Sequence, residues 1–192
     1  MDTHRTVPSA YFVTFHSYAT WLPGDPRGSV RRGDRYGDPY RGPCEALERR
    51  ALAVSRSLPV VLLGDERILV NRTLVEVCRH RAWVLLAAHV RTNHVHVVIT
   101  ATAPPARVLG DLKAWSTRRV IEARHRPPGA LLWARGGSVR HVWTHKAVAE
   151  ACFYVVHEQG DVLLGTVHFR ALTGAAPVAG LTAGVPYPRT GL

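Results

Sequence analysis

Two histidines separated by one residue, His94 and His96, are the first side chains in the sequence that could do chemistry. They lie in the run HVHVVIT, residues 94–100, whose β-branched composition is typical of a strand. Because alternate residues of a strand point to the same face, the two imidazoles would lie side by side, as ligands of a divalent metal do. Close spacings also arise by chance among 11 histidines, so the pair alone is a weak signal. An expected place in a central strand strengthens it, since a buried polar side chain needs a partner.

A tyrosine near the end of the chain, Tyr154, is the second candidate. It lies in the segment ACFYVVHEQG, within a helix that we expect over 146–159 and that Gly160 would end. At about 100° per residue, Glu158 would project near Tyr154, whereas Gln159 would lie further round unless the last turn unwinds. A tyrosine in such a segment can equally be a core residue with its hydroxyl at the rim.

Seven elements are expected to position these residues, in the order strand, helix, strand, strand, helix, strand, helix. This order predicts an α+β, ferredoxin-like (split βαβ) fold, with helices on one face of an antiparallel sheet and an added C-terminal helix that carries the tyrosine. The predicted strands are 10–17, 83–90, 94–100 and 138–144, and the predicted helices are 65–81, about 104–125 and 146–159.

The chain of 192 residues is expected to form one domain over residues 1–170. A Pro-, Gly- and Arg-rich stretch at about 21–43 has no steady period and is predicted to be a long loop. Such a loop is either a surface for contacts with backbone phosphates or a solvated insertion. Residues 171–192 are expected to be a flexible tail.

The charge balance points to a polyanionic partner. The formal net charge is +11 and the pI is about 10.6, which favours nucleic acid. A GC-rich coding bias would explain arginine in place of lysine but not the excess over acidic residues. The three cysteines form no CxxC pair, and no apolar run is long enough to span a bilayer. We therefore expect a cytoplasmic protein that does not enter membranes.

Five motifs occur in a fixed order: TWLPGDPRG, NHVHVV, DLKAWSTRRV, W-x-R-G-G-S-V-R-x-V-W and YVVHEQG. Together, over about residues 10–160, they resemble the single-tyrosine HUH transposases, the insertion-sequence-200-like group and its REP-associated relatives. In that family, two histidines flanking a bulky apolar residue hold a divalent metal, and a helix-borne tyrosine attacks single-stranded DNA. His94, His96 and Tyr154 stand at the matching positions.

The resemblance implies an enzyme that nicks and transfers single-stranded DNA carrying hairpins, through a 5′-phosphotyrosine intermediate and with Mg²⁺ or Mn²⁺. It also implies a homodimer in a bacterial cytoplasm, associated with the nucleoid when bound to DNA. Two imidazoles alone would accept zinc or nickel as well. The family's third ligand is a Gln or Asn four residues after the tyrosine. This chain has Glu158 there and Gln159 one residue later, so both are candidate metal ligands.

Basic residues near the fourth strand and on the second predicted helix could contact phosphates, or could be ordinary solvated charges. These candidate DNA contacts are Lys113, Arg118, Arg119, Arg135 and Arg140. Three tryptophans, Trp115, Trp133 and Trp143, could stack on unpaired bases or pack in the core.

Three other kinds of protein remain open. A domesticated or inactive copy would bind hairpin DNA or RNA through the same fold without cutting, although the intact His94, His96 and Tyr154 argue against decay. An RNA-binding module of this fold would carry an aromatic strand motif that HVHVVIT does not match. A histidine-metal hydrolase without covalent catalysis would need a third strong ligand and would leave Tyr154 without a role.

Overall fold

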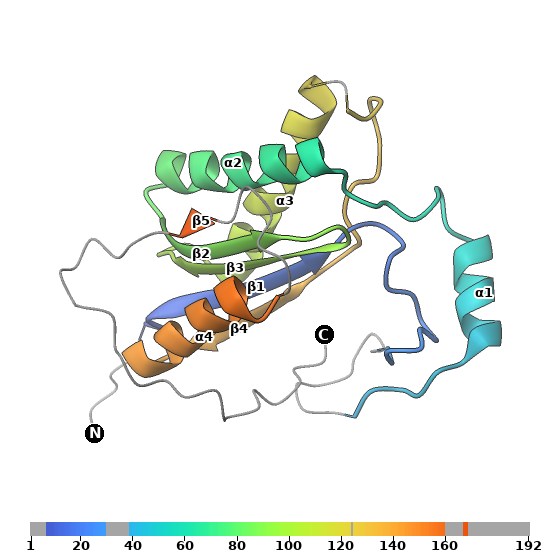
Figure 1. Ribbon diagram of the computed structural model, residues 1–192, viewed down its shortest axis with the longest axis horizontal. Helices are drawn as coiled ribbons and strands as arrows, with labels where there is room; N and C mark the ends of the chain where they lie inside the picture. Colours follow the sequence, from blue (N-terminus) through green and yellow to red (C-terminus); the bar gives the residue numbers. More distant parts are fainter. Residues whose placement is uncertain (1–6, 30–38, 124, 160–166, 169–192) are drawn as a thin grey trace.

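The computed structural model describes residues 7–29, 39–123, 125–159 and 167–168. Its centre is an antiparallel sheet in the strand order β4–β1–β3–β2–β5 (Figure 1). The strands are Ala10–His16 (β1), Val84–Val90 (β2), His94–Thr100 (β3), Ser138–Val142 (β4) and Val167–His168 (β5). The helices are Glu45–Ala53 (α1), Gly64–His80 (α2), Pro105–Glu122 (α3) and His145–His157 (α4).

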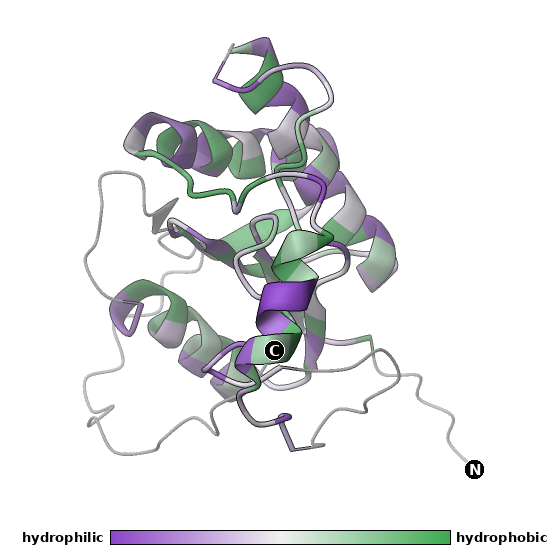
Figure 2. Cartoon of the chain, turned by 90° about the vertical axis from the view of Figure 1, so that its right-hand side faces the viewer, coloured by the Kyte–Doolittle hydropathy of each residue, from purple (hydrophilic) through white to green (hydrophobic). Residues whose placement is uncertain are grey.

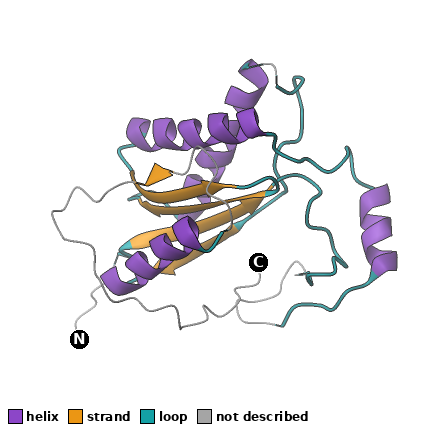
Figure 3. Ribbon diagram, in the orientation of Figure 1, coloured by secondary structure: helices purple, strands orange, loops and turns teal. Residues whose placement is uncertain are grey.

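Helices cover both faces of the sheet. Helices α2 and α3 lie on one face and α4 lies on the other, while α1 stands apart on long loops (Figures 1 and 3). The strands are largely apolar, whereas the helices alternate between apolar and polar residues (Figure 2). This is the period-2 and period-3.6 patterning that buries a sheet between helices. The α+β, ferredoxin-like prediction with an added C-terminal helix is confirmed.

Each layer of helices has its own core. Phe15, Val95 and Val97 are fully buried beneath α2 and α3. On the opposite face, Phe12 and Val98 pack with residues of α4. Alternation along β1 and β3 therefore sends the apolar odd-numbered residues to one layer and leaves the even-numbered ones for the α4 face.

The register of the central strands fixes which side chains meet on the α4 face. In the pairing of β1 with β3, His16 is opposite His94 and Thr14 is opposite His96. On the other side of β3, His89 of β2 is opposite His96. Directly opposed residues in an antiparallel pair share a face, so these polar side chains form one group at the end of the sheet.

Most predicted boundaries agree with the structure to within one to three residues, the usual scatter at element ends. One difference matters: α4 ends at His157 and not at Gln159. Helix α1 and the short strand β5 were not predicted. Helix α1 is nine residues long and has no buried residue, so it lies apart from the core that the predicted elements form.

The stretch at 21–43 is partly described. Residues 21–29 fold into hydrogen-bonded turns, and Ser29 pairs with Arg41 in an isolated antiparallel bridge. The predicted tail at 171–192 lies outside the described residues, and the single-domain boundary at 170 stays a prediction. Among the residues that are described, none of the helices has the length and apolarity to cross a membrane.

Candidate metal and nucleophile site

The two histidines of the HVH motif lie side by side on the α4 face of β3. Their ring centroids are 4.7 Å apart, and His96 is only 6% exposed. His96 stacks on Phe12 of β1, with centroids 5.5 Å apart. The strand alternation inferred from the sequence therefore brings both imidazoles to one place.

Neighbouring side chains engage one nitrogen of each ring. Nδ1 of His94 lies 2.8 Å from Oδ1 of Asn93, and Nδ1 of His96 lies 2.8 Å from Oγ1 of Thr14. In the tautomers whose Nδ1–H donates to these oxygens, each Nε2 presents its lone pair. A hydrogen bond to the far nitrogen is the usual support of a metal-binding imidazole.

Burial keeps both rings uncharged. Burial, reinforced by the nearby His16 and Arg91, lowers the pKa of His94 to about 3. Burial, together with the charges of His94 and His16, also holds the pKa of His96 well below its usual value. At neutral pH a cation would therefore meet two neutral ligands and displace no proton from them.

Tyr154 lies next to this pair in the same chain. Its ring centroid is 5.8 Å from that of His96 and 6.0 Å from that of Phe12, both in edge-on arrangements. The side chain is half-buried at the end of α4. The predicted nucleophile and the predicted metal ligands are thus brought together without a second copy of the chain.

The end of α4 separates the two candidates for the third ligand. Gln159 is 7% exposed, and its side chain lies near His94, where it partly offsets the lowered pKa of that imidazole, whereas Glu158 is exposed. In a continued helix, the carbonyl of Val155 would accept the N–H of Gln159. Here Nδ1 of His89 lies 3.2 Å from that carbonyl oxygen, and the helix has already ended at His157. The early end of the helix lets Gln159 turn toward the histidines.

The donor set fits a divalent cation. Within the described ranges, no group of three or more His, Cys, Asp and Glu side chains is arranged to hold a metal. Beside the two imidazoles, the side-chain amide of Gln159 lies next to His94 and could supply an oxygen donor. Two imidazole nitrogens and one amide oxygen, with positions left for phosphate oxygens, suit Mn²⁺ and also Mg²⁺ or Zn²⁺.

His16 belongs to the same group, and the sequence reasoning missed it. Its ring centroid is 5.4 Å from that of His94 and 4.7 Å from that of Trp21. Burial, helped by the charge of Arg27, lowers the pKa of His16 to about 4. Only the pairing of β1 with β3 places His16 here, and the one available signal was its position at the end of the first predicted strand.

The candidate DNA contacts fall into different places. Lys113 Nζ donates to the carbonyls of Ala134 and Gly136, at 2.6 and 2.8 Å. Arg119 forms ion pairs with Glu76 and Glu122. Both side chains are therefore already engaged within the protein.

The other three arginines differ in their positions relative to the site. Arg118 is exposed on α3, across the sheet from the histidines, and Arg135 is exposed before β4. Arg140 lies on the α4 face of β4 opposite Phe12, with its guanidinium carbon 5.2 Å from the ring centre. Of the five candidates, Arg140 shares both the face and an aromatic neighbour with Tyr154.

The tryptophans divide in a similar way. Trp133 is buried in the core, where its Nε1 donates to the carbonyl of Lys113, and Trp115 packs beside His80. Trp143 is 54% exposed. Of the three, it retains the most open surface for a base.

No protein-family model and no curated protein matches the chain. Among the solved structures that are similar to it are two transposases. One, a REP-associated tyrosine transposase bound to a REP hairpin, has a TM-score of 0.46 and 12% identity, over 81% of this chain and 71% of that one. The other, a candidate transposase from Deinococcus radiodurans, has a TM-score of 0.46 and 16% identity, over 78% and 91%. These identities are too low to carry a function over to this chain.

The buried neutral histidines predict a loss of stability in acid. His16 and His94 take up protons near pH 6.5 when the chain is unfolded, but only near pH 4 and pH 3 when it is folded. The unfolded state therefore binds more protons as the pH falls below 6.5, and the free energy of unfolding decreases from there down to about pH 3. Urea unfolding with EDTA should show a lower midpoint at pH 5 than at pH 7.5.

The matched variant is His94→Asn, which removes one of these proton-binding groups. Its midpoint should fall less between the two pH values than that of the wild-type chain. Equal drops in both proteins would contradict the assignment of the acid sensitivity to this site.

Proposed function

We propose that the chain is a transposase-type enzyme that cuts and rejoins single-stranded DNA through a covalent bond to Tyr154. The observation that carries the proposal is the proximity of Tyr154 to His96, with centroids 5.8 Å apart, beside the buried Gln159, whose side chain lies near His94. A nucleophile next to a set of neutral metal ligands is an arrangement that suits phosphodiester cleavage through a covalent intermediate.

His94, His96 and Gln159 are the residues that would hold the divalent ion. When bound, the ion supplies positive charge that lowers the free energy of the transition state at phosphorus. Asn93 and Thr14 orient the two imidazoles, and His89 helps to end α4 so that Gln159 faces them.

The protein's own part in the reaction is an attack by Tyr154. Its Oη forms a bond to phosphorus and loses the phenolic proton, while the bond from phosphorus to the 3′ oxygen breaks and that oxygen leaves as a hydroxyl. The product is a 5′-phosphotyrosine and a free 3′ hydroxyl. Because one phosphoester replaces another, a second DNA hydroxyl can reverse the step without an external energy source.

The DNA would be held by charge as well as by the metal. The net charge of +11 favours a phosphate backbone, and Arg140 lies beside Phe12, which itself contacts both His96 and Tyr154. We assign to Arg140 the contact with the backbone nearest the cleaved bond. Hairpin specificity, Mg²⁺ or Mn²⁺ as the working ion and a homodimer in solution belong to the same proposal.

The alternative is a domesticated protein of the same fold that binds hairpin DNA or RNA without cutting it. The contacts of Asn93 with His94 and of Thr14 with His96 favour the enzyme. A protein that only binds has no need of two neutral imidazoles oriented side by side next to an amide side chain.

Replacement of the nucleophile gives the first test. With single-stranded oligonucleotides from the DNA flanking the gene and Mn²⁺, the wild-type chain should form a covalent adduct visible on a denaturing gel. Tyr154→Phe should form none while still binding the strand, because it lacks only the attacking oxygen. His96→Ala should lose about a hundredfold or more of the adduct, since several kcal/mol of charge stabilisation is removed. An adduct in Tyr154→Phe would contradict the assigned nucleophile.

Two adjacent residues, Gln159 and Glu158, are the candidates for the third ligand, and each serves as the control for the other. Gln159→Ala should weaken Mn²⁺ binding, measured by titration calorimetry without DNA, by at least about tenfold. Glu158→Ala should bind Mn²⁺ like the wild-type chain, because its side chain is exposed. The reverse order of effects would transfer the ligand role to Glu158.

A further inference from the structure

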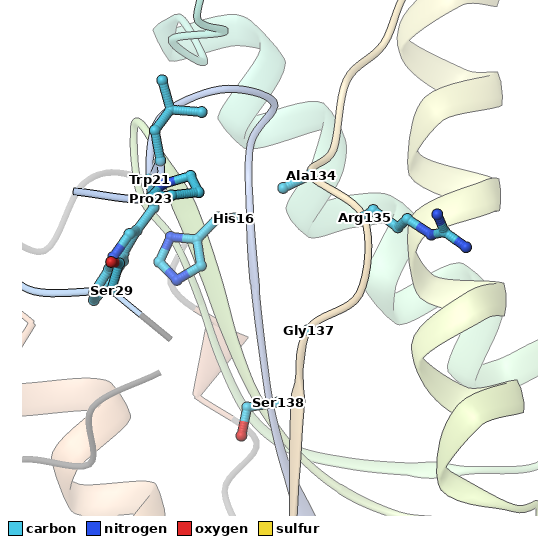
Figure 4. Close-up of a pocket in the computed structure, with 9 residues that line it drawn as sticks. His16, Trp21, Pro23, Ser29, Ala134, Arg135, Gly137 and Ser138 are labelled. Carbon is cyan, nitrogen blue, oxygen red and sulfur yellow. The ribbon is translucent and has the colours of Figure 1, made fainter. Parts of the chain in front are cut away.

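A cavity of about 240 Å³ lies next to the metal-ligand group, and the proposed chemistry does not use it. His16 lines it, and the His16 ring is 5.4 Å from that of His94, centroid to centroid. One wall is formed by the loop that contains Trp21 and Ser29, and the opposite wall by residues 134–138 (Figure 4). The cavity is therefore a direct neighbour of the site where the DNA would be cut.

The first wall holds an aromatic plane in a fixed position. Trp21 Nε1 donates to the carbonyl of Gly28 at 2.7 Å, and the guanidinium carbon of Arg27 lies 4.7 Å from the indole centre. Arg27 is itself held by Asp25 through an ion pair of 2.6 Å, which keeps the pKa of that carboxyl below its usual value. An indole held in this way offers a preorganised stacking surface.

The second wall, formed by the chain before β4, is also held in a fixed position. Lys113 of α3 donates to the carbonyls of Ala134 and Gly136, which fixes the chain before β4. At Gly137, where φ is +151°, a Cβ would lie 2.9 Å from the carbonyl oxygen of Thr14. The backbone therefore runs against β1 at a distance that only glycine allows, and this close approach sets the position of the wall.

His16 points into the space between the two walls (Figure 4). Both of its ring nitrogens are buried, and neither has a hydrogen-bond partner among the described residues. Buried polar atoms are nearly always paired, so an unpaired donor and acceptor here call for a ligand with a polar edge. A neutral imidazole offers one donor and one acceptor.

We propose that this cavity binds one unpaired base of the DNA strand, belonging to a nucleotide adjacent to the phosphate that Tyr154 attacks. The inference deepens the proposed function and rests on it. The base would stack against Trp21 and present its edge to His16. Through these contacts the cavity would select which bond of the strand is cut.

Size and charge favour a base over a phosphate or a larger ligand. The volume is below the range of about 300–1,000 Å³ that is typical of pockets for drug-sized molecules, and it suits one small flat group. A phosphate would need a cation inside, but Arg135 points away from the cavity (Figure 4) and Arg27 is paired with Asp25. Stacking on a tryptophan suits any unpaired base.

The test is an abasic scan of binding with the Tyr154→Phe chain in EDTA, so that neither cleavage nor metal enters. The probe is the single-stranded oligonucleotide from the gene's flanking DNA, with each unpaired nucleotide made abasic in turn. One position should weaken binding by about tenfold or more. With Trp21→Ala added, binding of the intact probe should fall by a similar factor and sensitivity at that position should disappear, while sensitivity elsewhere remains.

Two further variants test whether the effect of Trp21→Ala comes only from misfolding of the loop that contains Trp21. Trp21→Phe keeps a stacking ring and should retain the sensitive position, and His16→Leu should weaken discrimination among the four bases there. If no position depends on Trp21 while the wild-type chain forms its adduct, the cavity proposal is overturned and the proposed function stands. If a Trp21-dependent position exists but lies away from the cleaved bond, the assigned location is wrong.

The opposite outcome is also possible: binding could depend on Trp21 at one nucleotide position while the wild-type chain forms no covalent adduct. The base-binding cavity would then stand, and the covalent chemistry would fail. A chain that binds no strand at all would overturn both.

Discussion

The antiparallel pairing of β3 with its two neighbours determines what every side chain of the site can touch. It sets Thr14 opposite His96 and His16 opposite His94, and it places His89 on the far side of His96. A slip of one residue in this register would turn the histidines into the core beneath α2 and α3. The apolar residues that follow each of them, Val95 and Val97, prevent such a slip because they are fully buried on that side.

The second constraint is the end of α4. A helix that continued through residue 159 would keep Gln159 on a different side from the histidines, whereas the observed end at His157 frees it. The contact of His89 with the carbonyl of Val155 links this ending to the sheet. A buried histidine of β2, His89, which is 2% exposed, therefore links the sheet that carries the candidate metal ligands to the helix that carries Tyr154.

The pattern of neighbouring residues in the sequence predicted part of the site, whereas the part that depends on contacts between distant residues was not predicted. The alternation in HVHVVIT placed His94 and His96 on one face, and helical spacing placed Tyr154 at the end of the last helix, since both properties depend on a few neighbouring residues. The choice of Gln159 over Glu158 depends on a contact between residues 66 positions apart, and His16 enters through strand pairing. Helix α1 is only nine residues long, and so short a segment gives a periodicity too weak to predict it.

The central claim is that a single chain assembles the complete site, and mixing two inactive variants tests it most directly. His96→Ala retains Tyr154 and Tyr154→Phe retains the metal ligands, so each lacks a different half. If the site forms within one chain, as the 5.8 Å between the His96 and Tyr154 rings indicates, the wild-type chain forms the adduct and the mixture forms none beyond the separate variants. Restoration of the adduct on the His96→Ala chain in the mixture would show instead that tyrosine and histidines meet between two chains.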